Sequence, residues 1–139
     1  MVSRPFEFVA HTADVAALVR GRDLCDLLRN AAAALYCLAL GSASVEAVER
    51  RQIEVSSIDD HALLVDWLNE LIYLLSVERL VFSWFGFEHV GAGCLVAQCH
   101  GGRLPHSAKL QKEIKAATYH LASIVRNGDM LAVRIVFDV

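Results

Sequence analysis

The sequence predicts a single α+β domain, in which two long helices pack on one or more mostly antiparallel sheets. Leucines recur at helical spacing in two stretches of the chain, and six or seven shorter stretches are rich in β-branched and aromatic residues. Two pairs of these candidate strands are joined by short glycine-containing segments, which are typical of antiparallel hairpins. Each helix is therefore expected to bury one leucine-rich stripe against a sheet.

Chain length and composition support one globular domain spanning residues 1–139. A chain of 139 residues buries roughly two-thirds of its unfolded surface without disulfides or metals. The 55% hydrophobic and 21% charged residues fit a compact fold and exclude disorder. No apolar run approaches the roughly 20 residues of a membrane-spanning helix, and the start lacks a signal-peptide core. We therefore expect a cytoplasmic protein with no membrane partner.

The charge and the cysteines limit the partners further. A formal net charge of −3 argues against a free-standing nucleic-acid binder, so any role with RNA is expected to run through a partner protein. The four cysteines form neither a C-x-x-C motif nor a zinc-ribbon spacing, and we expect reduced, mostly buried thiols. They are Cys25, Cys37, Cys94 and Cys99.

The first half of the chain predicts two strands and a helix. Strands are expected at 4–9 and 15–19, on either side of His11-Thr12-Ala13-Asp14. Asp23 is placed to cap the following helix, and Gly41 stands where a glycine after a helix belongs. After this helix the pattern predicts a polar connector at 42–51 and a strand at 52–56. A second helix is expected from His61 to about Ser76, capped by Asp59 or Asp60. Strands at 80–90 and 94–101, joined by Gly91-Ala92-Gly93, and a loop at 101–111 follow it.

The end of the chain predicts a hairpin that organises the rest. Two β-rich runs, 114–125 and 131–139, flank residues 126–129, which contain an Asn-Gly turn signal. The second run alternates, ending with Asp138 and then Val139 and its carboxylate. Chain ends fray unless something holds them, so this end is expected to be built into a site.

Three carboxylates are the candidate metal ligands. Asp14, taken alone, is better explained as a turn or capping residue. If the terminal hairpin brings Asp138 and the Val139 carboxylate beside it, the three negative charges repel unless a cation or raised pKa values relieve them. Oxygen ligands of this kind suit hard divalent cations such as Ca²⁺, Mg²⁺ or Mn²⁺.

Three other polar residues, Lys115, His120 and Glu70, each allow two interpretations. Lys115 is either the solvent-facing member of an alternating strand or a phosphate contact at the rim of the acidic site. His120 is interpreted as a core or rim residue rather than a ligand, and Glu70 as either solvated or turned towards the sheet. The sequence contains no P-loop, nucleophile elbow or H-E-x-x-H motif, so it offers no evident nucleophile for an independent enzyme.

Four blocks of the sequence together resemble the archease family in order and spacing. They are residues 11–14, 63–73, 113–120 and the ending Phe137-Asp138-Val139. The resemblance implies a small α+β protein that assists an RtcB-class RNA ligase. That ligase joins RNA ends carrying a 2′,3′-cyclic or 3′-phosphate to 5′-hydroxyl ends with GTP and manganese. The accessory protein would promote guanylylation of the ligase and its multiple turnover in tRNA splicing and RNA repair.

The resemblance also implies roles for individual residues. Asp14, Asp138 and Val139 match metal-binding positions of the family, and Lys115 matches a functionally important lysine. The chain departs from the family at Ala10, where many members have aspartate, and in the 101–111 loop, which lacks the expected acidic residues and aligns His106 only loosely.

The expected function is thus that of a non-enzymatic ligase activator that meets RNA and GTP only through the ligase. Two alternatives stay open at this point. One is a stand-alone metal-dependent phosphohydrolase that uses the same carboxylates. The other is a chaperone-like modulator of RNA-processing proteins, which would not need the metal.

Overall fold

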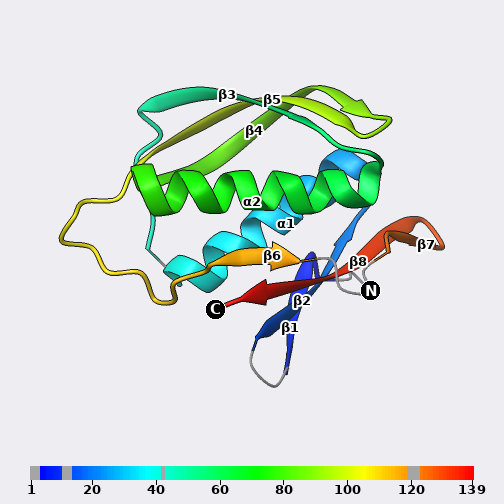
Figure 1. Ribbon diagram of the computed structural model, residues 1–139, viewed down its shortest axis with the longest axis horizontal. Coiled ribbons are helices and arrows are strands. Elements are labelled where there is room, and N and C mark those ends of the chain that lie inside the picture. The colour runs from blue at the N-terminus through cyan, green and yellow to red at the C-terminus, as the bar shows by residue number, and fades with distance from the viewer. Residues whose placement is uncertain (1–3, 11–13, 42, 119–122) are drawn as a thin grey trace.

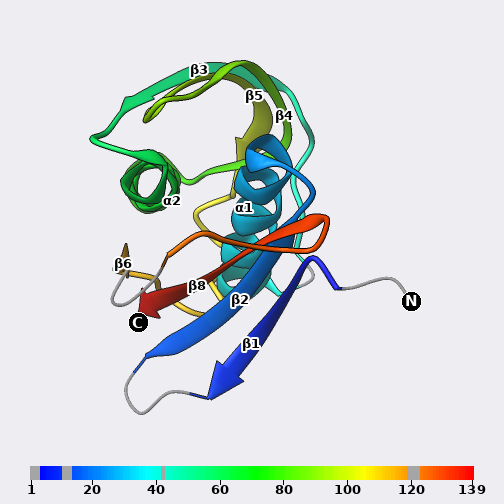
Figure 2. The same cartoon turned by 90° about the vertical axis from the view of Figure 1, so that its right-hand side faces the viewer.

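Two antiparallel sheets enclose the two helices (Figures 1 and 2). The computed structural model describes residues 4–10, 14–41, 43–118 and 123–139, and of Ala10 the backbone alone. In chain order the elements are β1 (Phe6–Ala10), β2 (Val15–Gly21), α1 (Leu24–Leu40), β3 (Glu49–Ser56), α2 (Asp60–Glu78), β4 (Leu80–Gly91), β5 (Cys94–Arg103), β6 (Ala116–Thr118), β7 (Val125–Asn127) and β8 (Met130–Asp138). The predicted α+β class is confirmed, with a sheet on each side of the helix pair.

Strand order makes β8 the centre of the larger sheet. That sheet runs β1-β2-β8-β6, and β7 pairs with β8 as well. The smaller sheet runs β3-β5-β4 and comes wholly from the middle of the chain. Every pairing is antiparallel. The last strand thus holds together segments from both ends of the sequence.

Both helices begin at the aspartates that the sequence suggests. The carboxylate of Asp23 accepts a hydrogen bond from the Asp26 amide at 2.8 Å, and Gly41 follows α1 with φ +64°. Asp59, rather than Asp60, caps α2 by accepting from the Ala62 amide at 2.8 Å. These carboxylates satisfy amides that a helix leaves unpaired at its start.

The core lies between the two sheets and is built on large side chains from every layer. Trp67 of α2 and Phe137 of β8 are completely buried. The indole N–H of Trp67 donates to the Leu28 carbonyl of α1 at 3.1 Å, so its one polar group is satisfied. Its ring packs edge-on against Phe85 and Phe87 of β4, at centroid distances of 5.3 and 5.6 Å.

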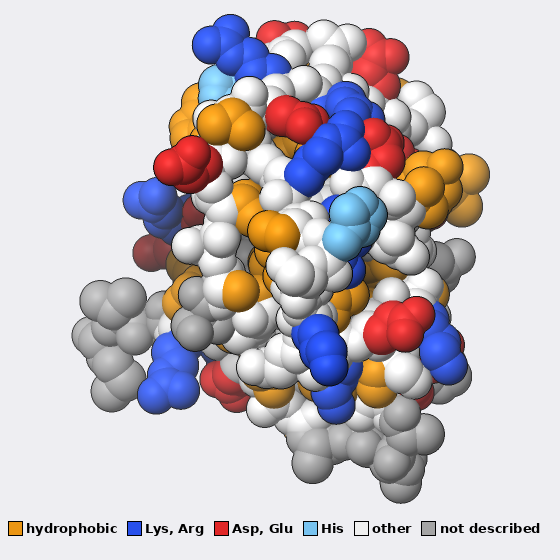
Figure 3. Space-filling model, turned by 90° about the vertical axis from the view of Figure 1, so that its left-hand side faces the viewer, with side chains coloured by type: hydrophobic (Ala, Val, Ile, Leu, Met, Phe, Trp, Pro, Cys, Tyr) orange, Lys and Arg blue, Asp and Glu red, His pale blue; other side chains and the backbone are white. Residues whose placement is uncertain are grey.

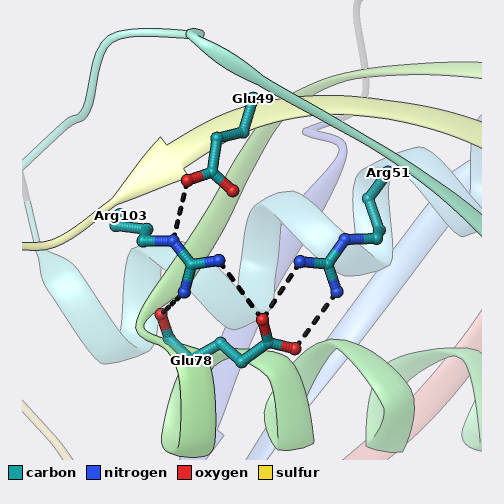
Figure 4. Close-up of polar contacts among 4 residues, drawn as sticks. All are labelled: Glu49, Arg51, Glu78 and Arg103. Carbon is teal, nitrogen blue, oxygen red and sulfur yellow. Dashed lines mark hydrogen bonds and ion pairs between the residues drawn. The ribbon is translucent and has the colours of Figure 1, made fainter.

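Four charged side chains join the end of α2 to the smaller sheet (Figure 4). Arg51 of β3 makes two hydrogen bonds to the Glu78 carboxylate, at 3.0 and 3.1 Å. Arg103 of β5 bridges Glu49 at 2.7 Å and Glu78 at 3.3 Å, and also donates to the Glu78 main-chain carbonyl at 2.9 Å. Acid and base alternate through this cluster, so each charge lies beside an opposite one.

The predicted strand and turn boundaries need three corrections. The run at 114–125 is not one strand, because β6 ends at Thr118 and β7 begins at Val125. The smaller sheet begins at Glu49 rather than at residue 52, because the polar residues at its start pair across to β5. The turn of the last hairpin is Gly128-Asp129, with Asn127 already paired to Met130. Polar strand ends look like connectors in sequence, which explains the second error.

The expectation of mostly buried thiols is wrong. Cys99 alone is buried, Cys37 is exposed, and the other two cysteines are half-buried. All four are free, as expected. Burial raises the pKa of the Cys99 thiol to about 12, which makes it a poor nucleophile near neutral pH.

Within the described ranges, neither helix is long and apolar enough to cross a membrane.

Candidate functional site

The pairing of β2 with β8 brings Asp14 to Asp138. Val15, the first residue of β2, pairs with Phe137 in the antiparallel register. Extending that register by one residue places Asp14 opposite Asp138. Asp14 lies in a bend directly before β2, so this extension brings the backbone at Asp14 beside the backbone at Asp138 at one end of the sheet. Asp14 is half-buried and Asp138 is exposed.

Lys115 lies on the other side of Asp138. Ala116, the first residue of β6, pairs with Asp138 in the register. The main-chain amide of Lys115 donates to the Asp138 carbonyl at 2.8 Å. Lys115 directly precedes β6 rather than standing inside a strand as predicted, and it is exposed. The structure thus places a cation next to the strand end that carries the acid.

Helix α2 holds the segments that flank this site. The side-chain amide of Asn69 accepts from the Ala117 N–H at 2.8 Å and donates to the Ala117 carbonyl at 3.1 Å. Nearer the start of the helix, Nδ1 of His61 accepts from the Ile124 N–H at 2.8 Å. These bonds fasten β6 and the approach to β7 to the helix, which in turn fixes the backbone next to Lys115.

The end of β8 is anchored on the inside of the molecule. Phe137 is completely buried, and the half-buried side chain of Val139 packs against the core. Asp138, between them, is exposed. The alternation of a strand therefore turns Asp138 outwards while its neighbours hold the backbone in place.

The acidic pair fits a hard cation in the chemistry of its donors. If the two carboxylates come close they would repel each other, and a bound cation would offset that repulsion. Asp14, Asp138 and the carboxylate of Val139 would supply oxygen donors. Among the residues that the structure describes, no three His, Cys, Asp or Glu side chains cluster closely enough to hold a metal by themselves.

The remaining sequence candidates contribute less. Glu70 is half-buried on α2, and His106 is exposed in the loop after β5. His120, with the segment His11-Thr12-Ala13, lies outside the described residues.

Sequence reasoning missed the role of Asn69, which looks like one of several polar residues that interrupt an apolar helix face. Its signal is position, because Asn69 lies on the same helical stripe as buried Val65 and Ile72.

One face of the molecule, shown in Figure 3, carries acidic and basic side chains interleaved with apolar ones. The charged cluster of Glu49, Arg51, Glu78 and Arg103 pairs its two arginines with its two glutamates. That pairing leaves no excess of positive charge in the cluster. A duplex or single strand of nucleic acid requires a basic surface, and this pairing does not provide one.

Comparisons with known proteins agree along nearly the whole chain. Residues 6–139 match the model of the Archease protein family (MTH1598/TM1083). Protein archease of Methanosarcina acetivorans is 32% identical over 141 residues, covering 98% of this chain and 97% of the relative. Protein archease of Methanothermobacter thermautotrophicus is 32% identical over 136 residues, covering 96% and 97%.

Two solved structures share the fold. The solution structure of Methanobacterium thermoautotrophicum protein 1598 superposes with a TM-score of 0.81 at 30% identity, covering 97% of this chain and 99% of the other. The crystal structure of a Thermotoga maritima protein, described as an archease and possible chaperone, gives a TM-score of 0.65 at 24% identity, covering 100% and 98%. With a family match over 134 of 139 positions (6–139) and these relatives, the chain belongs to the archease family.

Proposed function

We propose that this protein activates an RtcB-class RNA ligase by promoting guanylylation of the ligase and its multiple turnover. It would do so as a non-enzymatic partner in tRNA splicing and RNA repair. The observation that supports the proposal is the β2–β8 register, which pairs Val15 with Phe137 and so brings the backbone at Asp14 near Asp138, with the Lys115 amide bonded to the Asp138 carbonyl. The resemblance to the family implies functional roles for Asp14, Asp138 and Lys115.

In this mechanism the acidic residues and the lysine act at the nucleotide site of the ligase. Asp14, Asp138 and the Val139 carboxylate would hold a divalent ion, with Ca²⁺ expected first and Mg²⁺ or Mn²⁺ as alternatives. The ion would supply positive charge beside the transferring phosphoryl group. Lys115, a compact point charge on a flexible stem, would reach the phosphate and neutralise charge that develops during transfer.

The charge of the molecule favours action through a protein. The chain carries a net charge of −3, and arginines in the charged cluster are already paired with glutamates. A partner ligase would supply the surface that holds RNA and GTP. The small acidic edge of this protein would then meet a phosphate-binding site that is already basic.

The carboxylates can be tested directly. Asp14→Ala and Asp138→Ala are expected to abolish stimulation of ligase guanylylation and to weaken Ca²⁺ binding, because each removes an oxygen ligand. Transfer of labelled GMP to the ligase measures the first effect, and calorimetric titration with CaCl₂ measures the second. Asp129→Ala, at the turn at the opposite end of β8, is the matched control and is expected to behave as the unmodified protein.

Lys115 separates metal binding from activation. Lys115→Gln is expected to bind Ca²⁺ normally and to lose stimulation, since it removes the phosphate contact alone. A folded Asp14→Ala/Asp138→Ala double variant that still stimulates the ligase fully would rule the mechanism out.

A chaperone-like modulator is the second candidate, because the Thermotoga maritima relative is described as a possible chaperone. Such an activity would act by docking alone and would not need the carboxylates. Association of the double variant with the ligase, measured together with guanylylation, separates the two. Retained binding with lost guanylylation favours the activator, and retention of both favours the modulator.

A further inference from the structure

All three lysines of the chain lie in one short segment. They are Lys109, Lys112 and Lys115, the lysine row, whereas the arginines are spread along the sequence. The segment runs from the end of β5 to the start of β6, along one end of the molecule (Figure 1). With three lysines and one glutamate, residues 104–118 carry a formal charge of +2 in a chain whose total is −3. An acidic molecule therefore gathers positive charge at one place, next to the end of β8.

The charges of the lysine row are available to a partner. All three lysines are exposed. Within the described ranges, no carboxylate forms an ion pair with any of them, whereas Arg20 and Arg51 each bridge a glutamate. A charge that is already paired within the molecule gives up that pair when it meets another anion. The lysine row has no such pair to give up.

The backbone of the segment is held against the molecule. The amides of Gln111 and Lys112 both donate to the Ala39 carbonyl, near the end of α1, at 2.7 and 3.3 Å. Leu110 packs against the core, and Ile114 is only 6% exposed. Because these apolar side chains turn inwards, the lysines between and beside them turn to solvent. The row is thus a fixed line of charge that leads to the proposed site.

The length of the row indicates the kind of ligand. Lys115 follows Lys109 by six positions, so their backbones lie at most about 20 Å apart. A nucleoside triphosphate covers only part of that distance, whereas a single strand of RNA repeats its phosphates along it. Protein interfaces are depleted in lysine and are centred on aromatic or apolar anchors. No large hydrophobic side chain is exposed between residues 104 and 115, so RNA fits the row better than a protein surface does.

We propose that Lys109 and Lys112 contact successive phosphates of a single-stranded RNA end while the ligase holds that RNA. Lys115 keeps its place at the nucleotide site, and the other two lysines guide the strand that leads to it. The contacts are to the RNA backbone, so they carry no base preference. This inference rests on the function proposed above, because the ligase supplies the main RNA surface and so few lysines bind RNA only weakly by themselves.

The first test uses the full chain without the ligase. A ten-nucleotide oligouridylate at about 20 mM salt is expected to shift the NMR amide signals of residues 109–115, since low salt strengthens phosphate contacts. The shifts should disappear in Lys109→Gln/Lys112→Gln and as salt is added. No shift in this segment at millimolar RNA would overturn the proposal. So would tighter binding of a glutamate hexapeptide than of the oligouridylate, since the row would then be a surface for an acidic protein.

Arg22→Gln/Arg126→Gln is the matched control for the lysine variant. It removes the same charge from two exposed side chains, which follow β2 and lie in β7 at the end of β8 opposite to Asp138. It is expected to keep the RNA-dependent shifts of residues 109–115. Loss of these shifts in the control as in the lysine variant would show that net charge, and not the row, binds the RNA, and would overturn the proposal.

The second test uses the ligase. With Lys109→Gln/Lys112→Gln, the RNA concentration for half-maximal ligation is expected to rise about fivefold or more. The slope of log affinity against log salt should fall by about 1.4, or about 0.7 for each lost phosphate contact. Guanylylation without RNA should equal that of the unmodified protein. An unchanged RNA dependence, or lost guanylylation without RNA, would overturn the inference.

Failure of the proposed function can be told apart from failure of this inference. If Asp14→Ala/Asp138→Ala still stimulates the ligase fully, the metal mechanism is wrong, but the RNA-dependent shifts of residues 109–115 are expected to remain. If those shifts are absent while the two aspartate variants abolish stimulation, the function stands and the RNA contact is wrong.

Discussion

Asn69 is the residue on which the geometry of the candidate site most depends. Strand β6 is short and pairs on one side with β8. On its other side the Asn69 amide takes the place of a further strand by bonding both the N–H and the carbonyl of Ala117. A polar backbone that would otherwise be left unpaired in a half-buried position is thereby satisfied.

We predict that Asn69→Ala destabilises the protein by about 1–3 kcal/mol, because it leaves both Ala117 backbone groups without partners. It should also speed hydrogen exchange at the Ala117 amide and reduce ligase stimulation, since the backbone beside Lys115 loses its support. Urea unfolding and amide exchange measure these effects. Ser76→Ala, at an exposed position of the same helix, is the control and should change stability by less than about 0.5 kcal/mol. Equal behaviour of the two variants would contradict the role given to Asn69.

The sequence could identify the charged residues of the candidate site, but not the residue whose hydrogen bonds hold the backbone beside them in place. Asp14 and Asp138 stand out as acids at strand ends, and the family likeness singles out Lys115. Asn69 is chemically unremarkable in the sequence, because its partner is a backbone 48 residues away.

At the level of elements, Asp59 sets the start of α2 and so the position of the whole helix. Its carboxylate accepts from the Ala62 amide, and the same first turn carries His61, whose Nδ1 accepts from the Ile124 N–H. A misplaced first turn would therefore disturb the segment before β7 as well as the helix itself.

We predict that Asp59→Ala lowers the free energy of unfolding by about 1 kcal/mol, the usual effect of removing a helix N-cap. Asp59→Ser, which keeps an oxygen able to accept from the same amide, should recover most of that loss. Urea unfolding monitored by circular dichroism measures both. Identical stability of the alanine and serine variants would show that the cap contributes nothing.

Helices were easier to predict than strands because their signals are local. A capping aspartate, a leucine stripe and a terminal glycine fix α1 to within a residue or two. The prediction of one strand at 114–125 was wrong because alternation shows only that a segment could form a strand. Whether it does depends on a partner strand to pair with. β8 offers partners to β6 and β7 in separate places, and the described residues pair only there.

At the scale of the whole molecule, the charged cluster of Glu49, Arg51, Glu78 and Arg103 ties the end of α2 to the smaller sheet at the surface. The hydrophobic core joins the same two layers in the interior. Hydrogen bonds from Arg51, and secondarily from Arg103, hold the pKa of Glu78 below its usual value. A carboxyl whose pKa is lower when folded stabilises the protein fully above its unfolded pKa. That stabilisation disappears as the pH falls through the folded pKa.

We predict that Glu78→Gln lowers the melting temperature at neutral pH, and that the difference from the unmodified protein shrinks as the pH falls below about 4.5, the ordinary glutamate value. Added salt should reduce the difference too, since the cluster is partly open to solvent. Differential scanning calorimetry across this pH range measures it. Glu88→Gln, an exposed glutamate on β4, is the control. A difference that persists unchanged to pH 3 would exclude the ion pairs as its source.

The architecture as a whole was predictable in class but not in layering. Leucine stripes show that each helix buries a face, yet a stripe does not reveal whether one sheet or two will cover it. α2 has buried residues on most of its circumference, including Leu63, Trp67 and Ile72. That wide burial is the sign of a helix enclosed from two sides.

The strand order has a consequence for how the molecule assembles. The smaller sheet is built from one stretch of the chain, residues 49–103, whereas β2 and β8 lie more than 100 residues apart. Nearly the entire chain must therefore close into a loop before β2 and β8 meet. Contacts between distant segments form slowly, because the entropy of closure is lost before any bond compensates it. The proposed site needs both ends of the chain, so we expect it to form at a late stage of folding.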